Sequence, residues 1–418
     1  MDKKMETGFQ YIAVSSEIAD TKIINKLLNN YSEILSTAGG CKTDDAQIDS
    51  RLPLFYFVLT GGTENFVMYI VERRKKQKGN EPVYIIAHSS NNSLPASLEI
   101  LARIKQIGGK GKIFYLENPI DENGIRKIKE SVKFISVKRE LENSRIGLIG
   151  EASDWLVASS PKSDVIKKSW GPEIIEIDLA EVTKQLGSAA MQSAGITNFK
   201  EGAAQIFEPE ESEIAENESV YFAIKNIADK YQLNSLSIRC FDLVVDQKTT
   251  GCFAISQLND EGIIAGCEGD LVSTVGMLLG YKLIDELIWM ANPSKISLQN
   301  STLTLAHCTV PRKMISNYNL RSHFESGLGV GIEGKLPEGR VTLFRLGGKN
   351  MEKLWTAEGE LIGNSTNSNL CRTQAEIKID DRNKLEELLA NPLGNHLLMI
   401  YGNHSKLLEE YKSFIENN

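Results

Sequence analysis

The chain has 418 residues, of which 41% are apolar and 24% are charged, and its formal net charge is -8 at pH 7. This composition is that of an ordinary globular protein, and the length allows two to four domains of about 100–200 residues each. The acidic balance argues against nucleic acid as a partner, because nucleic-acid binding requires a basic surface. The one basic run, residues 72–79, is expected to be a solvated helix end.

The sequence shows neither a membrane segment nor a cysteine framework. No apolar stretch approaches the roughly 20 residues that span a bilayer, and residues 1–10 lack the apolar core of a signal peptide. We therefore expect a cytoplasmic protein with no membrane partner. The six cysteines include no CxxC pair, so they predict neither a zinc knuckle nor a disulfide framework, and most are expected to be small buried hydrophobes.

Strand and helix patterns alternate through the first third of the chain. Residues 55–60 and 83–88 are continuous apolar runs that end in small or polar residues, and residues 111–116 resume the strand pattern. Such runs are typical of strands buried on both faces of a parallel sheet. Residues 1–144 are therefore predicted to form a doubly wound, Rossmann-like α/β domain.

The alternation starts again at residue 145. Residues 145–156 are interpreted as a strand, a glycine turn and a helical stretch, and residues 235–244 as a later strand. A second Rossmann-like α/β domain is predicted over residues 145–295. No glycine-containing turn matches a P-loop or the dinucleotide fingerprint, so nucleotide binding is not expected.

The pattern changes after residue 295. Short strand-like runs are separated by clusters of Gly, Pro, Asn and Lys, and a closing helix is predicted at residues 405–416. Residues 296–418 are therefore predicted to form a β-rich, barrel-like C-terminal domain. The fold class predicted for the whole chain is α/β, with two doubly wound α/β domains followed by this barrel.

Two carboxylates separated by one glycine, Glu268 and Asp270, stand between a small-residue run and an apolar helical run. One interpretation is a plain helix start, because acidic residues favour the first turn of a helix. The other is a metal or acid/base site at the end of a strand. Both interpretations are true if Glu268 ends the strand and Asp270 opens the helix. Gly266 and Gly269 would let another backbone or a ligand approach closely.

Five segments, in order along the chain, closely resemble the L-fucose isomerase and L-arabinose isomerase superfamily. They are "TGGTE" (60–64), "CEGDL" (267–271), "WMANPSKI" (289–296), "LAHCTVP" (305–311) and "GNHLLMIYG" (394–402). The likeness is densest in residues 235–311. The resemblance implies a metal-dependent aldose–ketose isomerase of carbohydrate metabolism that acts on a monosaccharide or modified monosaccharide, with Mn²⁺ or Mg²⁺ as cofactor. It also implies a homo-oligomer, possibly a hexamer.

Carried onto this sequence, the resemblance places the metal ligands at Glu268 and His396, with His307 as a further site histidine. The family's second carboxylate falls on Asn292, so the implied catalytic pair is Glu268 and Asn292. An asparagine offers an amide oxygen to a metal but cannot take a proton. Nearby carboxylates could stand in for it, either through a shifted alignment or as neighbours: Asp270, Asp285 and Glu286.

The remaining implied positions are possible sugar contacts, and each has a structural alternative. The segment 60–64 could be only a strand-to-helix turn with Thr63 capping a helix. Trp289 and Trp155 could be packing residues, and His396 a hydrogen-bonded core histidine. The residues predicted to bind substrate are Thr60, Gly61, Gly62, Glu64, Trp289 and His323.

Two alternatives to the isomerase stay open at this point. One is a catalytically silent sugar-binding relative that shares the scaffold and the pocket but lacks the proton relay. The other keeps the metal and the pocket and runs different enolate chemistry. The replacement of a carboxylate by Asn292 is the feature that makes the first of these worth testing.

Overall fold

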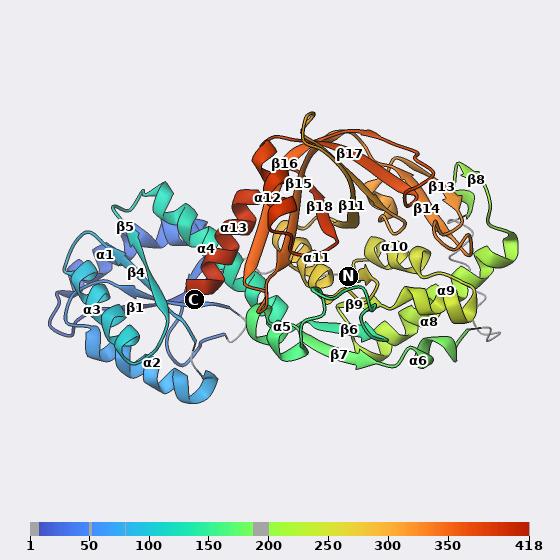
Figure 1. The fold of residues 1–418 in the computed structure, drawn as a ribbon. Helices are drawn as coiled ribbons and strands as arrows, with labels where there is room; N and C mark the ends of the chain where they lie inside the picture. The colour runs from blue at the N-terminus through green and yellow to red at the C-terminus, as the bar shows by residue number, and fades with distance from the viewer. Residues whose placement is uncertain (1–7, 50–51, 80, 187–199, 418) are drawn as a thin grey trace. The chain divides into compact units, whose positions relative to one another are not determined.

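The computed structural model describes residues 8–49, 52–79, 81–186 and 200–417 (Figure 1). It contains two compact units, residues 1–138 with 411–418 and residues 139–410. None of the described helices is both long enough and apolar enough to cross a membrane. All six cysteines are free thiols, and four of them are buried, as expected for small core residues: Cys240, Cys252, Cys267 and Cys308.

The first unit is built on a parallel five-stranded sheet in the order β2-β1-β3-β4-β5. Because β1 lies between β2 and β3, the chain winds first to one side of β1 and then to the other, which confirms the doubly wound prediction. The strands are β1 (Phe9–Val14), β2 (Gly40–Lys42), β3 (Leu54–Val58), β4 (Val83–His88) and β5 (Gly111–Leu116). The connecting helices are α1 (Thr21–Thr37), α2 (Glu64–Lys78), α3 (Ser93–Gln106) and α4 (Glu122–Glu142).

The second unit begins with a parallel four-stranded sheet in the order β10-β9-β6-β7. Its strands are β6 (Arg145–Ile149), β7 (Glu173–Ile177), β9 (Ser235–Ile238) and β10 (Ile264–Cys267). The helices that precede or follow these strands are α5 (Ser163–Trp170), α6 (Ala180–Thr183), α8 (Glu211–Tyr231), α9 (Cys240–Gln247) and α10 (Cys252–Asp260).

Two local predictions in this sheet were wrong. The stretch after β6 is not helical, because Gly150 takes a left-handed conformation (φ 78°) and the backbone N–H of Ser153 bonds across to Glu268 instead of within a helix. The predicted strand 235–244 stops at Ile238, and the helix α9 begins at Cys240.

The rest of the second unit is a closed antiparallel barrel in the order β11-β12-β17-β16-β15-β18. The barrel begins at Trp289. Its first strand does not show a regular pattern in the sequence, because Pro293 and a β-bulge between Pro293 and Lys295 interrupt it. Its strands are β11 (Trp289–Ser297), β12 (Thr302–His307), β15 (Gly339–Gly347), β16 (Lys353–Asn364), β17 (Thr373–Ile379) and β18 (Leu397–Tyr401). The remaining elements are β8 (Gln205–Ile206), η2 (Arg312–Met314), β13 (Asn317–Arg321), β14 (Gly331–Lys335), α12 (Arg382–Ala390) and α13 (Ser405–Asn417).

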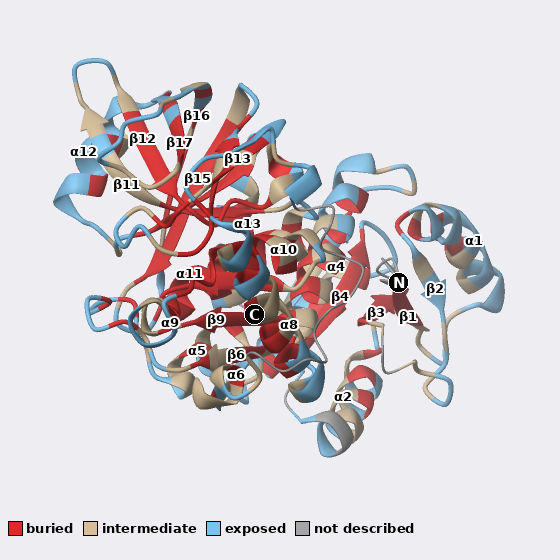
Figure 2. Cartoon of the chain, turned by 90° about the vertical axis from the view of Figure 1, so that its right-hand side faces the viewer, coloured by how far each residue is buried: buried red, intermediate tan, exposed pale blue. Residues whose placement is uncertain are grey.

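The helix α11 (Leu271–Ile284) joins the parallel sheet to the barrel, and Figure 2 shows it among the most buried elements. Every residue of its first part, from Leu271 to Gly280, is buried, as expected for a helix covered on most sides. A Cβ added at Gly276 would lie 2.5 Å from Leu398 Cδ1 on β18, so the helix packs closely against the outside of the barrel. This packing brings the start of β18 to the start of α11, where His396 and Glu268 lie.

Candidate metal centre

Glu268, His307 and His396 come together in a buried group whose possible ligand atoms all lie within 4.8 Å of one another. The Oε1 atom of Glu268 is 3.4 Å from His396 Nε2 and 3.9 Å from His307 Nε2. Donors that share one ion at about 2.0–2.2 Å are roughly 3–3.5 Å apart at tetrahedral or octahedral angles. The two contacts of Glu268 are thus within a few tenths of an ångström of this spacing, whereas the widest pair in the group, at up to 4.8 Å, would have to close by roughly one ångström.

Glu268 sits in a strained turn between β10 and α11. Its φ is 64°, and that of Gly269 is 71°, so both residues are in the left-handed region. A non-glycine residue there costs about 1–3 kcal/mol and persists only where its surroundings hold it. A Cβ on Gly269 would lie 2.5 Å from the carbonyl oxygen of Glu151, which confirms the close backbone approach predicted from this glycine.

Asp270 links the turn to His396. Its Oδ1 accepts a hydrogen bond from the backbone N–H of Ser273, so it opens α11 as the N-cap, and its Oδ2 lies 2.9 Å from His396 Nδ1. Since an ionised carboxylate only accepts, Nδ1 carries a hydrogen, and the second nitrogen of His396 is turned towards Glu268. The helix start is thus confirmed at this segment, and Glu268 of the same segment belongs to the group that could hold a metal ion.

The second nitrogen of His396 is the observation that best fits a cation. Nε2 is fully buried and makes no hydrogen bond within the described part of the chain. A buried polar atom without a hydrogen-bond partner is rare and costly in folded proteins. Placed beside a carboxylate oxygen and a second imidazole, it is suited to bind a metal ion.

Asp270 is itself anchored by Arg345 of β15. The Arg345 Nη1 donates to Asp270 Oδ2 at 3.0 Å, its Nη2 donates to Ser159 Oγ at 2.6 Å, and the residue is 1% exposed. Ser273 Oγ donates to the same carboxylate oxygen at 2.7 Å. These contacts fix the carboxylate that orients His396. Sequence reasoning missed Arg345, for which the signal was a single charge within the apolar run of β15.

The pKa values follow from this packing. Burial raises the pKa of Glu268, but the imidazole of His396, 3.4 Å away, lowers it more and leaves the pKa below its usual value. Burial acts likewise on Asp270, and the Arg345 charge with the His396 hydrogen bond brings that pKa down. Burial and the charge of His396 lower the pKa of His307 to about 4. The pKa of His396 is raised, because the hydrogen bond to Asp270 and the nearby carboxylate of Glu268 outweigh burial. A proton on His396 therefore occupies the place where a cation would bind.

Aromatic residues line one side of Glu268. The indole Nε1 of Trp155 donates to Glu268 Oε2 at 2.7 Å. The Trp155 ring lies edge-to-face on Phe241 with centroids 4.8 Å apart, and Phe241 lies edge-to-face on His323 at 5.5 Å. His323 is 8% exposed, and its Nδ1 is 3.0 Å from Ser326 Oγ. Its role in substrate binding stays a prediction.

Asn292 lies half-buried on β11, between the strands that carry the two histidines. It pairs with Ala306, the residue before His307, while Ala291 pairs with Leu397, the residue after His396. Its backbone therefore runs beside the cluster. A role for its side chain in the metal site stays a prediction.

The other predicted sugar contacts are Trp289 and four residues of the segment 60–64. Trp289 is 0% exposed and packs in the barrel core, so it is not part of the proposed sugar site. Thr60, Gly61, Gly62 and Glu64 belong to the first unit and stay predictions. The structural alternative for this segment holds in part. Thr63 is the N-cap residue of α2, but its hydroxyl donates to the carbonyl of Thr60 and makes no capping bond to the helix.

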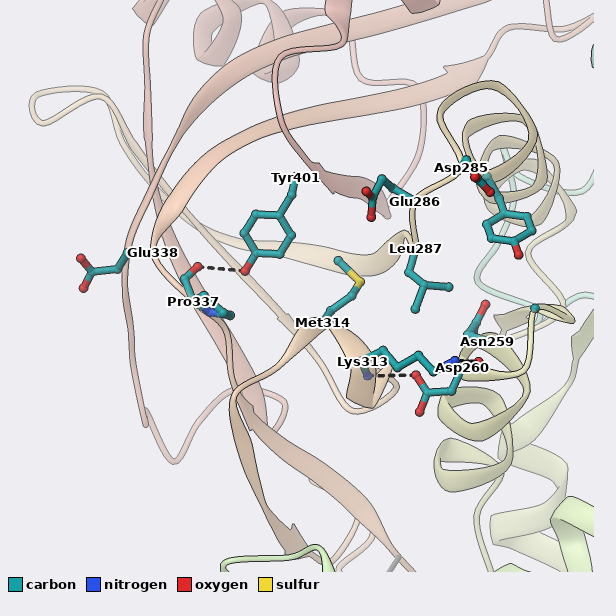
Figure 3. Close-up of a pocket in the computed structure, with 12 residues that line it drawn as sticks. Asn259, Asp260, Asp285, Glu286, Leu287, Lys313, Met314, Pro337, Glu338 and Tyr401 are labelled. Atoms are coloured by element: carbon teal, nitrogen blue, oxygen red, sulfur yellow. Dashed lines mark hydrogen bonds between the residues drawn. The ribbon is translucent and has the colours of Figure 1, made fainter. Parts of the chain in front are cut away.

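Asp285 and Glu286 are excluded as partners of Glu268. They follow the C-terminal end of α11, whereas Glu268 precedes its start, and the 14 residues of this helix span about 21 Å. Both line a separate cavity of about 600 Å³ (Figure 3). The shifted alignment that would have paired either of them with Glu268 is therefore wrong. The cavity is also lined by Asn259, Asp260, Gly262, Tyr281, Leu287, Lys313, Met314, Pro337, Glu338 and Tyr401.

No protein-family model matches this chain. Two proteins named sulfoquinovose isomerase, from Priestia aryabhattai and Priestia megaterium, are each 19% identical to it over 306 residues, which is 71% of this chain and 68% of theirs. A third protein of the same name, from Alkalicoccus urumqiensis, is 18% identical over 306 residues, which is 71% of this chain and 69% of its own. This chain is thus similar, at low identity, to sugar isomerases.

Proposed function

We propose that this protein is a metal-dependent aldose–ketose isomerase that acts on a monosaccharide or modified monosaccharide. The observation that carries the proposal is the buried group of Glu268, His307 and His396, in which Nε2 of His396 has no hydrogen-bond partner among the described residues. The similarity to proteins named sulfoquinovose isomerase supports a sugar as the substrate.

The donor set favours a transition metal over magnesium. Two imidazoles and one carboxylate suit transition ions such as Fe²⁺ and Zn²⁺, whereas Mg²⁺ prefers oxygen ligands alone, and Mn²⁺ is the transition ion among those that the resemblance implies. A bound divalent cation would hold two neighbouring sugar oxygens and polarise the carbonyl. We therefore take Mn²⁺ as the first candidate and Mg²⁺ as the comparison.

Glu268 would be both a ligand and the group that moves the proton. Asp270 is held ionised by Arg345 and is already engaged by His396, so it is not available as a base. Asn292 cannot take a proton. One carboxylate can nevertheless remove the proton from C2 of the sugar and return it to C1 on the same face, while the proton of the C2 hydroxyl passes through solvent to the C1 oxygen. The lack of a second carboxylate at position 292 is compatible with isomerisation by a single base.

The test is to load the purified protein with Mn²⁺ and follow a panel of aldoses, sulfoquinovose included, by NMR for ketose formation. Turnover that requires the metal supports the proposal. A protein that binds Mn²⁺ and a sugar of the panel, but converts none, would instead be the catalytically silent sugar-binding relative. That alternative was raised because Asn292 stands where the family has a carboxylate.

Changing Asn292 to aspartate tests whether this position contributes to the metal site. An added anion next to the two histidines should raise Mn²⁺ affinity by roughly tenfold or more, because affinity follows the charge of the ligand set. Titration calorimetry of Asn292→Asp, with Asn292→Ala as the matched control, measures the effect. An unchanged dissociation constant in both variants would remove Asn292 from the site.

Mn²⁺ affinity should rise with pH and its binding should release a proton. His396 has its pKa raised above 6.5, so at neutral pH a proton competes with the cation, whereas Glu268 and Asp270, with lowered pKa values, stay ionised. The affinity should therefore keep increasing as the pH rises above 6.5. Calorimetry in buffers of different ionisation enthalpy detects the released proton. A dissociation constant independent of pH and buffer would contradict this protonation state.

A further inference from the structure

Trp155 reaches Glu268 because the loop that carries it is fastened to the Glu268 turn. The backbone N–H of Ser153 donates to the carbonyl of Glu268 at 2.9 Å, and Gly269 leaves room for Ala152, whose Cα would lie 2.7 Å from a Cβ at position 269. The loop position is thus determined by the same two residues that place the carboxylate. The indole N–H then lies 2.7 Å from Glu268 Oε2, although half of Trp155 is exposed.

This contact gives the two oxygens of Glu268 different surroundings. Oε1 faces the histidines, at 3.4 Å from His396 Nε2 and 3.9 Å from His307 Nε2, while Oε2 accepts from the indole. An indole N–H is a donor without charge. It can hold one oxygen in place without adding a positive charge that would repel a cation, as a lysine or arginine would. Oε1 is then the oxygen that faces the metal, and the second lone pair of Oε2 stays open to take the proton.

The ring of Trp155 supplies a second, separable feature. One side of it packs edge-to-face on Phe241, and the residue keeps 50% of its surface exposed beside Glu268. Aromatic rings combine a large apolar surface with a polar edge. An exposed indole next to the proton-transfer group is suited to pack against the C–H face of a sugar ring.

We propose that Trp155 is a positioning residue for Glu268, through its N–H, and a specificity-determining contact for the sugar, through its ring. The first part rests only on the metal site, and the second rests on the proposed isomerase function. The two parts can be separated, because phenylalanine keeps an aromatic face and removes the N–H, whereas leucine removes both.

The experiment measures Mn²⁺ binding without sugar by calorimetry, and then KM and kcat for the converted aldose. Trp155→Phe should weaken Mn²⁺ binding by about 10- to 100-fold, the usual effect of losing a group that orients a metal ligand, and should leave KM at saturating Mn²⁺ close to the wild-type value. Trp155→Leu should weaken Mn²⁺ binding equally and raise KM as well. Glu286→Gln, in the separate cavity beyond the other end of α11, should bind Mn²⁺ as the wild type does.

Tryptophan fluorescence gives an independent signal, because paramagnetic Mn²⁺ quenches a nearby indole. The wild-type emission should fall on Mn²⁺ addition, and most of that fall should be absent in Trp155→Phe at saturating Mn²⁺, since Trp155 would be the indole nearest the ion. Thermal unfolding confirms that each variant is folded. Equal Mn²⁺ affinity in wild type and Trp155→Phe would overturn the positioning role, and equal KM in Trp155→Phe and Trp155→Leu would overturn the sugar contact. If no variant and no wild-type sample isomerises any sugar, the proposed function fails, while the metal measurement still decides the positioning role.

Discussion

Glu268→Gln is expected to reduce isomerisation by about 10²- to 10⁴-fold, the range for loss of a general base. A glutamine cannot take the proton, and it replaces a carboxylate that accepts through both oxygens with an amide that has one acceptor end and one donor end. Its NH₂ group would have to face either the Trp155 N–H or His396. Mn²⁺ binding should therefore weaken as well. The measurements are kcat by NMR and the Mn²⁺ dissociation constant by calorimetry.

The matched control is Glu286→Gln, the same substitution at the opposite end of α11, where the side chain lines the separate cavity. It should turn over sugar and bind Mn²⁺ as the wild type does. Glu268→Gln with kcat within tenfold of the wild-type value would show that another group moves the proton.

Asp270→Asn has the second largest expected effect, and it acts on both stability and metal binding. It leaves the buried guanidinium of Arg345 without its counter-charge. Breaking a buried ion pair in this way typically lowers the free energy of unfolding by about 3–5 kcal/mol, and we expect a loss of that size here. It also weakens the bond that orients His396, which should lower Mn²⁺ affinity by about 10- to 100-fold. Urea unfolding measures the first effect and calorimetry the second.

A second substitution separates these two effects. In Asp270→Asn combined with Arg345→Met, no charge is left unpaired between the two positions, so much of the lost stability should return. His396 still lacks its carboxylate partner, so Mn²⁺ affinity should stay low. Recovery of both quantities would mean that Asp270 matters only through its pairing with Arg345.

Much of the fold could be predicted, because buried parallel strands such as β3 and β4 are almost continuously apolar and the barrel strands are short runs separated by clusters of Gly, Pro, Asn and Lys. The misplaced elements have local causes. The β-rich domain was predicted to begin at residue 296, and β11, which starts at Trp289, was not recognised as a strand, because Pro293 and its bulge break the pattern. The turn after β6 was interpreted as a helix because its geometry depends on a bond to Glu268 that no local pattern reveals.

The candidate site could be predicted only in part. Glu268, His307 and His396 were identified from the resemblance, and the structure brings them together. Trp155 lies 113 residues from Glu268 in sequence and Arg345 lies 75 from Asp270, so their contacts arise from the packing of the loop after β6 and of the barrel. No periodicity links positions so far apart, and such contacts become visible only once the elements are assembled.

The account depends most on a divalent cation held by Glu268, His307 and His396 at the place where the sugar reacts. The most direct test is to add Mn²⁺ stepwise to metal-stripped protein and follow aldose-to-ketose conversion by NMR, with sulfoquinovose in the panel. We predict a rate that rises with bound Mn²⁺ and levels off at one ion per chain, with no conversion in the stripped protein. Full turnover in the presence of chelator, or no turnover of any sugar at saturating Mn²⁺, would contradict the account.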